Sequence, residues 1–109
     1  MTYVVDGEEL ETDEQGYLLQ PDWRDEAVRV IAAAENIELT EDHWKVVNYL
    51  REQYREHGHT PNFRIMLKDM AALIPGCDSK RLYELCPLGP AKQGAKLAAL
   101  PQPLGKGGY

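Results

Sequence analysis

The 109-residue chain has only two cysteines, Cys77 and Cys86, and neither lies near the C-terminus. Two thiols are a poor basis for a disulfide framework, and the three histidines follow no ligand spacing relative to them. We therefore expect no metal site and no cofactor. No apolar run approaches the roughly 18 residues of a membrane span, and the acidic N-terminus does not resemble a signal peptide. These absences predict a cytoplasmic protein.

Basic residues are scarce in the first 44 positions, where 13 Asp or Glu stand against Arg24 and Arg29, a formal charge of −11. Residues 45–109 hold ten Lys or Arg against five acidic residues, a formal charge of +5. A dipolar chain of this kind can offer a basic face to an acidic partner. A solvated surface whose two halves differ in composition explains the charges equally well. The glycines lie in turns and in the tail, so no phosphate-binding loop is present.

The segments that are present predict a mainly α, α+β domain. In "YVVDGEEL", Asp6 and Gly7 suit the type I′ turn of a β-hairpin that points Val4 and Leu10 toward the core. Apolar periodicity and capping residues then predict an orthogonal bundle of about five helices. The first predicted helix spans 21–37, and the second spans 41–57, between a Thr40 cap and a Gly58 stop. The third begins at Thr60 and Pro61. A short fourth helix follows Asp78 or Ser79, and the fifth begins at Pro90.

Apolar side chains at helical spacing define the expected core. Trp44 is expected at its centre, where replacement by Ala costs about 3–5 kcal/mol. Met66 and Met70 suit core packing better than a partner groove. The other residues expected to be buried are Trp23, Ala27, Val30, Ile31, Ala34, Val47, Leu50, Tyr54, Phe63 and Leu67.

The chain ends in "GPAKQGAKLAALPQPLGKGGY", a basic helix that breaks into Pro-x-Pro and then into glycines. We expect a single domain over residues 1–100 and a flexible arm over 101–109. About the last eight residues should be variable in position, because Gly-rich and Pro-rich tails make few contacts.

Four segments carry a resemblance to a known family: "VDGEELETDEQGYL", "LTEDHWKVVNYLREQYRE", "TPNFRIMLKDM" and "GPAKQGAKLAALPQPLG". In this order they resemble the DsrC/TusE family across almost the whole chain. The resemblance implies a helical domain with an N-terminal hairpin and a helix-turn-helix-like portion. It also implies a role in sulfur transfer. TusE relays persulfide sulfur toward tRNA thiolation, and DsrC is a substrate partner of dissimilatory sulfite reductase.

In this family the chemistry takes place on the C-terminal arm, and this chain departs from the family there. The nearly terminal cysteine that carries the persulfide falls on Lys106, and the inner cysteine of DsrC falls on Ala95. Lysine cannot form a persulfide, and sulfane transfer needs a thiolate. The resemblance therefore predicts a non-catalytic docking or regulatory member with a protein partner in sulfur-transfer or sulfite-reductase machinery.

An active sulfur carrier that uses another thiol is the first alternative. Cys86 ends the predicted segment "KRLYELC", where a buried position and the helix C-terminus would both disfavour the thiolate. Cys77 is expected in an exposed turn, "IPGCDSK", where Lys80 and Arg81 would lower its pKa. His57 and His59 are expected to be exposed turn residues rather than a catalytic pair.

Docking to an acidic partner would use basic residues beside the arm. The candidates are Arg64, Lys68, Lys80, Arg81, Lys92, Lys96 and Lys106, although ordinary surface cations would look the same. A DNA-binding regulator is the second alternative. Its helix-turn-helix-like segment, residues 41–73, carries equal numbers of basic and acidic residues, whereas duplex binding favours a basic stripe. Nucleic acid is therefore the less favoured partner.

Overall fold

A computed structural model describes residues 2–103 of the chain. Strands β1 (Thr2–Val5) and β2 (Glu8–Glu11) form an antiparallel hairpin. Helices follow in the order α1 (Asp25–Ala34), α2 (Glu41–His57), α3 (Phe63–Leu73), α4 (Ser79–Leu85) and α5 (Pro90–Leu97). This arrangement confirms the predicted mainly helical α+β class.

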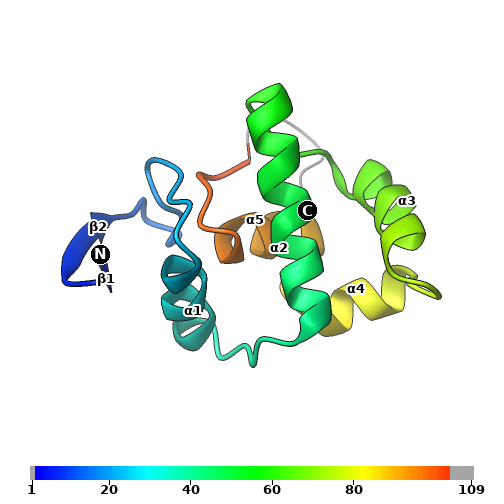
Figure 1. Cartoon of the computed structure of the whole chain (residues 1–109), viewed down its shortest axis with the longest axis horizontal. Coiled ribbons are helices and arrows are strands. Elements are labelled where there is room, and N and C mark those ends of the chain that lie inside the picture. Colours follow the sequence, from blue (N-terminus) through cyan, green and yellow to red (C-terminus); the bar gives the residue numbers. More distant parts are fainter. Residues whose placement is uncertain (1, 104–109) are drawn as a thin grey trace.

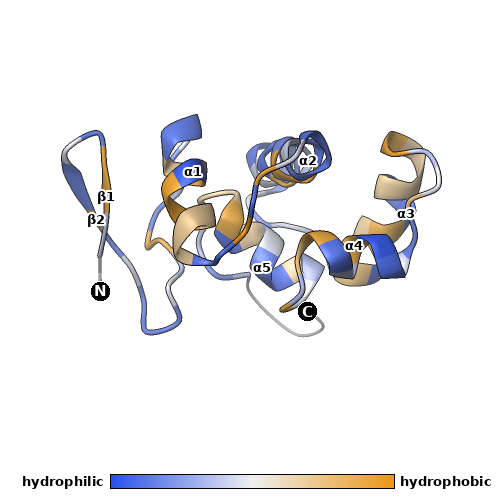
Figure 2. Cartoon of the chain, turned by 90° about the horizontal axis from the view of Figure 1, so that it is seen from below, coloured by the Kyte–Doolittle hydropathy of each residue, from blue (hydrophilic) through white to orange (hydrophobic). Residues whose placement is uncertain are grey.

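The long helix α2 and the short helix α5 form the centre of the molecule. Figure 1 shows α2 crossing in front of α5, with the hairpin and α1 on one side and α3 and α4 on the other. The perpendicular view in Figure 2 shows α5 in a separate layer below α2. Val46, Leu50 and Leu97 are fully buried between these layers. A smaller apolar cluster, which includes Tyr3, Val5 and Ile31, joins the hairpin to α1.

The hairpin turn forms as predicted, since Asp6 and Gly7 both adopt positive φ angles, 52° and 81°. Val4 and Leu10 were both predicted to point toward the core, and for Val4 this prediction is wrong, because Val4 is 56% exposed. Tyr3 lies opposite Leu10 and shares its face, whereas Val4 lies opposite Glu9. The Tyr3 hydroxyl also donates a hydrogen bond to the Gly16 carbonyl, 3.1 Å away. Tyr3 and Val5 therefore fill the core side of β1.

Helix α1 is shorter than the predicted helix over 21–37. It starts only at Asp25, because Arg24 has an extended ψ of 136° and the Asp22 carbonyl, which a longer helix would bond within itself, accepts from Arg51 Nη2 at 3.2 Å. It ends before Asn36, whose left-handed φ of 57° reverses the chain. Trp23 therefore precedes the helix and is 41% exposed, which corrects the expectation that it is buried.

Helices with strong local caps begin where predicted. The Thr40 hydroxyl accepts from the backbone N–H of His43, and Gly58 ends α2 at a left-handed φ of 75°. Asp78 caps α4 in the same way, and Pro90 opens α5. Helix α3 is the exception. It is capped by Asn62 rather than by Thr60, so Pro61 lies outside it.

The centre of the core differs from the prediction at one aromatic residue. Trp44 is only partly buried and packs at the edge of the main cluster, under the guanidinium of Arg29. Ala34 is exposed as well. Met66 and Met70 have no exposed surface, which confirms them as core residues. The other expected core residues are buried or packed against the two clusters: Ala27, Val30, Ile31, Val47, Leu50, Tyr54, Phe63 and Leu67.

Candidate functional site: the root of the C-terminal arm

The arm leaves the body through a buried turn directly after α5. Ala98, Ala99 and Leu100 have no exposed surface, and Ala99 takes a left-handed φ of 63°. The backbone N–H of Leu100 donates to the carbonyl of Ala95 at 3.1 Å, which closes the turn. Pro101 to Pro103 then continue along the surface. The body therefore sets the direction in which the arm emerges.

A buried arginine of α2 fixes this turn to the start of α1. Arg51 is 4% exposed. Its Nε donates to the Ala98 carbonyl at 3.0 Å, and its Nη2 donates to the carbonyls of Asp22 and Arg24 at 3.2 and 3.0 Å. Its Nη1 forms an ion pair with Asp25 at 3.1 Å. Burial lowers the pKa of Arg51, and Asp25 opposes that shift.

Sequence reasoning missed this role of Arg51, although a signal was available. Trp44, Val47 and Tyr54 mark the apolar stripe of α2, and Arg51 lies on the same stripe, four residues after Val47. Its burial also removes one of the five cations that the DNA-binding alternative would use, because a 4% exposed guanidinium is not available to a phosphate.

The two positions that the resemblance assigns to the family's cysteines have different locations. Ala95 lies on α5 with no exposed surface. Lys106 lies outside the described residues, as does most of the tail predicted to be variable in position. The methyl group of Ala95 therefore fills a packed position in the centre of the fold.

Both thiols of this chain are buried and free. Cys86 is 1% exposed at the C-cap of α4, and burial raises its pKa from 9.0 to about 12. This confirms the prediction of a buried Cys86. Cys77 is 7% exposed, so the expectation of an exposed turn thiol was wrong. Burial raises the pKa of Cys77, and the carboxylates of Asp78 and Asp42 raise it further against the opposing effect of Arg81.

The proposed basic docking residues divide into two groups. Arg64, Lys68, Lys80 and Lys92 are exposed, and within residues 2–103 none of them forms an ion pair. Arg81 pairs with Asp42 at 2.9 Å and with Glu84 at 3.4 Å. Lys96 is largely covered: its ammonium lies 3.7 Å from Glu35 and over the Tyr17 ring.

The three histidines differ in burial. His57 is exposed, as is His59, with ring centroids 6.1 Å apart. His43 is buried, and its Nδ1 accepts from the Thr40 backbone N–H at 3.1 Å, so its Nε2–H donates to the Leu85 carbonyl at 2.8 Å. Within residues 2–103, no three His, Cys, Asp or Glu side chains gather as a metal site would require. No helix there is long and apolar enough to cross a membrane.

The described residues define a class of small, mainly helical domain in which an N-terminal hairpin packs on the body and the C-terminal arm is held where it leaves α5. A family described as "DsrC like protein" matches residues 4–105. The "Sulfurtransferase TusE homolog" of Haemophilus influenzae is 46% identical over 91% of this chain and 94% of its own length. The chain belongs to the DsrC/TusE family.

Solved structures agree with this assignment. The oxidized γ-subunit of the dissimilatory sulfite reductase (DsrC) from Archaeoglobus fulgidus superposes with a TM-score of 0.86 at 35% identity, covering 96% of this chain and 98% of that chain. Allochromatium vinosum DsrC superposes with a TM-score of 0.84 at 41% identity and the same coverage. The hairpin-and-helix fold is therefore shared with DsrC proteins.

Proposed function

We propose that this chain is a docking or regulatory member of the DsrC/TusE family that does not carry sulfur itself. It would act in the cytoplasm on a protein partner of sulfur-transfer or sulfite-reductase machinery. One observation supports the proposal most directly: the positions of the two family cysteines hold Ala95, which is fully buried, and Lys106. We also propose that residues 1–100 form the docking domain and residues 101–109 its arm.

The chemistry of sulfur relay explains why these replacements matter. A thiolate attacks the outer sulfur of a donor persulfide, the S–S bond of the donor breaks, and the donor departs as a thiolate. The acceptor then holds the sulfur as its own persulfide. Neither a methyl group nor an ammonium group can take this role. The arm of this chain can therefore enter a partner's site without reacting there.

Among the candidates, Arg64, Lys68, Lys80 and Lys92 are exposed and form no ion pair within residues 2–103, and we propose that they make up the docking face. We expect Lys106 to contribute to it, and expect less from Arg81 and Lys96, whose charges are already compensated inside the fold. Attraction between exposed charges weakens with salt, so binding through this face should be salt-dependent.

Charge reversal tests the docking face. Binding to a TusE-accepting sulfur-relay complex and to a dissimilatory sulfite reductase is measured for wild type, Arg64→Glu and Lys92→Glu. Lys45→Glu is the control, because Lys45 is an exposed cation of α2 that forms no ion pair within residues 2–103 and is not one of the candidate residues. The proposal predicts weaker binding for the first two variants only. Equal losses in all three variants would contradict it.

The names of the relatives favour one second candidate, a sulfurtransferase. In this chain its carrier would be Cys77 or Cys86. Incubation with a persulfide donor, read by the mass of the intact protein, separates the two functions. A docking protein gains no sulfur on either thiol in its folded state. A carrier gains one sulfane sulfur per chain. One of the two substitutions, Cys77→Ser or Cys86→Ser, then abolishes this gain and identifies the cysteine that carries the sulfur.

A further inference from the structure

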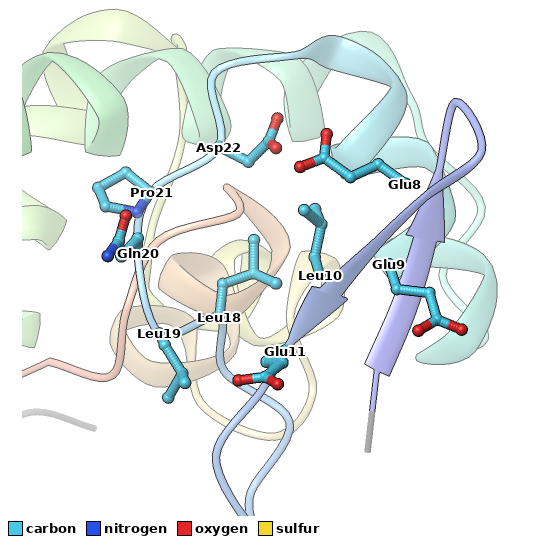
Figure 3. Close-up of a pocket in the computed structure, with 9 residues that line it drawn as sticks. All are labelled: Glu8, Glu9, Leu10, Glu11, Leu18, Leu19, Gln20, Pro21 and Asp22. Atoms are coloured by element: carbon cyan, nitrogen blue, oxygen red, sulfur yellow. The ribbon is translucent and has the colours of Figure 1, made fainter.

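The outer face of the hairpin combines an exposed apolar side chain with two carboxylates. Leu10 lies on the inner face, which packs on α1. Side chains alternate along a strand, so Glu9 and Glu11 lie on the other face, together with Val4, which is opposite Glu9 in the register. Figure 3 shows Glu9 pointing away from the space that Leu10 and Leu18 border. Both carboxylates are exposed, and neither forms an ion pair within residues 2–103.

Leu19 adds a second apolar side chain to this outer face. Its backbone N–H donates to the carbonyl of Glu11 at 3.3 Å, next to the bridge between Thr12 and Leu18. Leu18 is buried on the inner side, so alternation places Leu19 on the outer side, where it is 56% exposed. Two apolar and two acidic side chains therefore share the outer face of the hairpin.

The exposed face of α3 has the opposite charge. Met66 and Met70 point into the core, so Arg64, Ile65 and Lys68 lie on the side of the helix that faces away from it. Ile65 is 48% exposed. Neither cation forms an ion pair with any residue that the structure describes. This face therefore places an exposed apolar side chain beside two uncompensated cations.

The acidic residue of α3 does not compensate these cations. Asp69 is partly buried against α2, where its carboxylate accepts a hydrogen bond from the Tyr49 hydroxyl at 2.5 Å. An acidic group from outside this helix is thus needed to neutralise the face.

The charges on the two faces have similar spacings. Glu9 and Glu11 are two residues apart on a strand that rises about 3.3 Å per residue, so their backbone positions lie about 7 Å apart. Arg64 and Lys68 are one helical turn apart, a rise of about 6 Å. A strand with its carboxylates at this spacing can therefore place both of them against the two cations.

The two faces lie at opposite ends of the molecule. Figure 1 shows the hairpin at one end of the longest axis and α3 at the other, and the described residues extend 38 Å along this axis. Each face points away from the body, so a single chain cannot join its own two faces. A second copy can join them. Other orientations would bring the acidic halves of two copies together, since residues 1–44 have a formal charge of −11.

We propose that copies of this chain associate head to tail, with the outer face of one hairpin against α3 of the next copy. The two carboxylates of one copy then pair with Arg64 and Lys68 of the next, and the exposed apolar side chains of the two faces pack together. Because two different faces meet, each added copy leaves one face of each kind open, and the contact propagates instead of closing as a dimer. Its ion pairs are exposed, so association is weak, reversible and reduced by salt.

Sedimentation velocity of the full-length protein over a series of concentrations tests the contact. At low salt, the average mass of wild type should rise with concentration without levelling at the mass of two copies, and added salt should return it to the monomer. One double variant, Glu9→Gln with Glu11→Gln, removes the acidic face, and another, Arg64→Gln with Lys68→Gln, removes the basic face. Each should stay monomeric alone. An equal mixture of the two should associate only as far as a pair, because each variant contributes one intact face.

Matched controls change the same number of charges elsewhere on the surface. They are Glu14→Gln with Glu38→Gln, and Lys45→Gln with Lys92→Gln, all at exposed positions. Both should associate as wild type does. Lys92 also separates this inference from the docking function proposed above, which needs Lys92 whereas self-association does not. A wild type that stays monomeric at low salt, a mass that levels at two copies, a mixture that stays monomeric, or an equal loss in the controls would overturn the proposal.

Discussion

At the scale of single residues, Arg51 holds the turn from which the arm leaves the body. It connects α2 to the carbonyls of Asp22, Arg24 and Ala98 from a site that is 4% exposed. Removal of a buried hydrogen-bonding partner leaves the remaining polar groups desolvated and unpaired. Arg51 therefore couples the stability of the body to the direction in which the arm leaves it.

We predict that Arg51→Leu lowers the free energy of unfolding by about 3 kcal/mol, because the buried Ala98 carbonyl and the partly buried carbonyls of Asp22 and Arg24 lose the guanidinium that donates to them. Lys45→Leu is the control on the same helix. Its side chain is exposed and forms no ion pair within residues 2–103, so the substitution should change stability by about 0.5 kcal/mol or less. Urea titration followed by circular dichroism measures both. A loss below about 1 kcal/mol for Arg51→Leu would mean that water replaces the guanidinium at no great cost.

The thiol of Cys86 should make stability depend on pH in the alkaline range. Its pKa is about 12 in the folded chain and 9.0 ordinarily, so between these values the unfolded chain has lost a proton that the folded chain retains. Stability therefore falls as pH rises from about 9 to about 12, since the folded state binds more protons.

Cys86→Ala isolates this contribution from the tyrosines whose pKa values are also raised by burial, such as Tyr3 and Tyr17. We predict that the variant is less stable than wild type at pH 7 and that its deficit narrows above pH 9. Urea titrations at pH 7, 9 and 10.5 provide the measurement. A deficit of constant size across this range would show that Cys86 ionises as easily in the folded chain as in the unfolded one.

At the scale of secondary-structure elements, the close packing of α2 on α5 depends on a glycine. A Cβ atom on Gly94 would lie 2.9 Å from Leu50 Cδ1 and 3.6 Å from Val46 Cγ1. Alanine within a helix normally stabilises it by about 1 kcal/mol relative to glycine. Here the extra methyl group meets a side chain that is itself fully buried, so steric crowding opposes the gain in helix propensity.

We predict that Gly94→Ala destabilises the protein by about 1–2 kcal/mol, because overpacking of a filled core outweighs helix propensity. The same methyl group should be tolerated when Leu50 is shortened. In a double-mutant cycle, Gly94→Ala should therefore cost less in the Leu50→Ala background than in wild type. Additive effects would show that Leu50 is not the residue that meets the new methyl group.

Elements with local signals could be predicted from the sequence, and elements shaped by distant contacts could not. The Thr40 and Asp78 caps mark the starts of α2 and α4 by hydrogen bonds within one turn. The start of α1 depends on a bond to a residue distant in sequence, from Arg51 on α2 to the carbonyl of Asp22. Periodicity alone extends this helix to Pro21, because nothing near Pro21 in the sequence reveals that bond.

The candidate site could be predicted only where it depended on residue identity. That Lys106 and Ala95 replace thiols is visible in the sequence, and so is a buried position for Cys86 before a proline. Burial of Cys77 was missed because Lys80 and Arg81 suggested an exposed basic turn, whereas Arg81 pairs with Asp42 and Glu84. Only the three-dimensional contacts distinguish the candidate docking residues that form ion pairs, such as Arg81 and Lys96, from those that do not.

At the scale of the whole molecule, the chain has the family's body, and it has Ala95 and Lys106 at the positions that the resemblance assigns to the family's cysteines. Residues 1–44 are strongly acidic, and they contribute both the hairpin and the segment that anchors the root of the arm. The cations of the proposed docking face, which form no ion pair within the described part of the chain, lie in residues 64–92. In the proposed function, this body presents the arm to a partner, and the residue at position 106 decides whether the arm can accept sulfur.

The most direct test of the central claim is therefore to return a thiol to the arm. Wild type and Lys106→Cys are incubated with a persulfide donor, and sulfane sulfur is located by mass spectrometry of intact protein and of peptides. Cys77 and Cys86 are present in both proteins and serve as internal controls. The account predicts no sulfur on wild type and a persulfide on residue 106 of the variant. Sulfur on Cys77 or Cys86 of the folded wild type, with none gained at position 106, would contradict it.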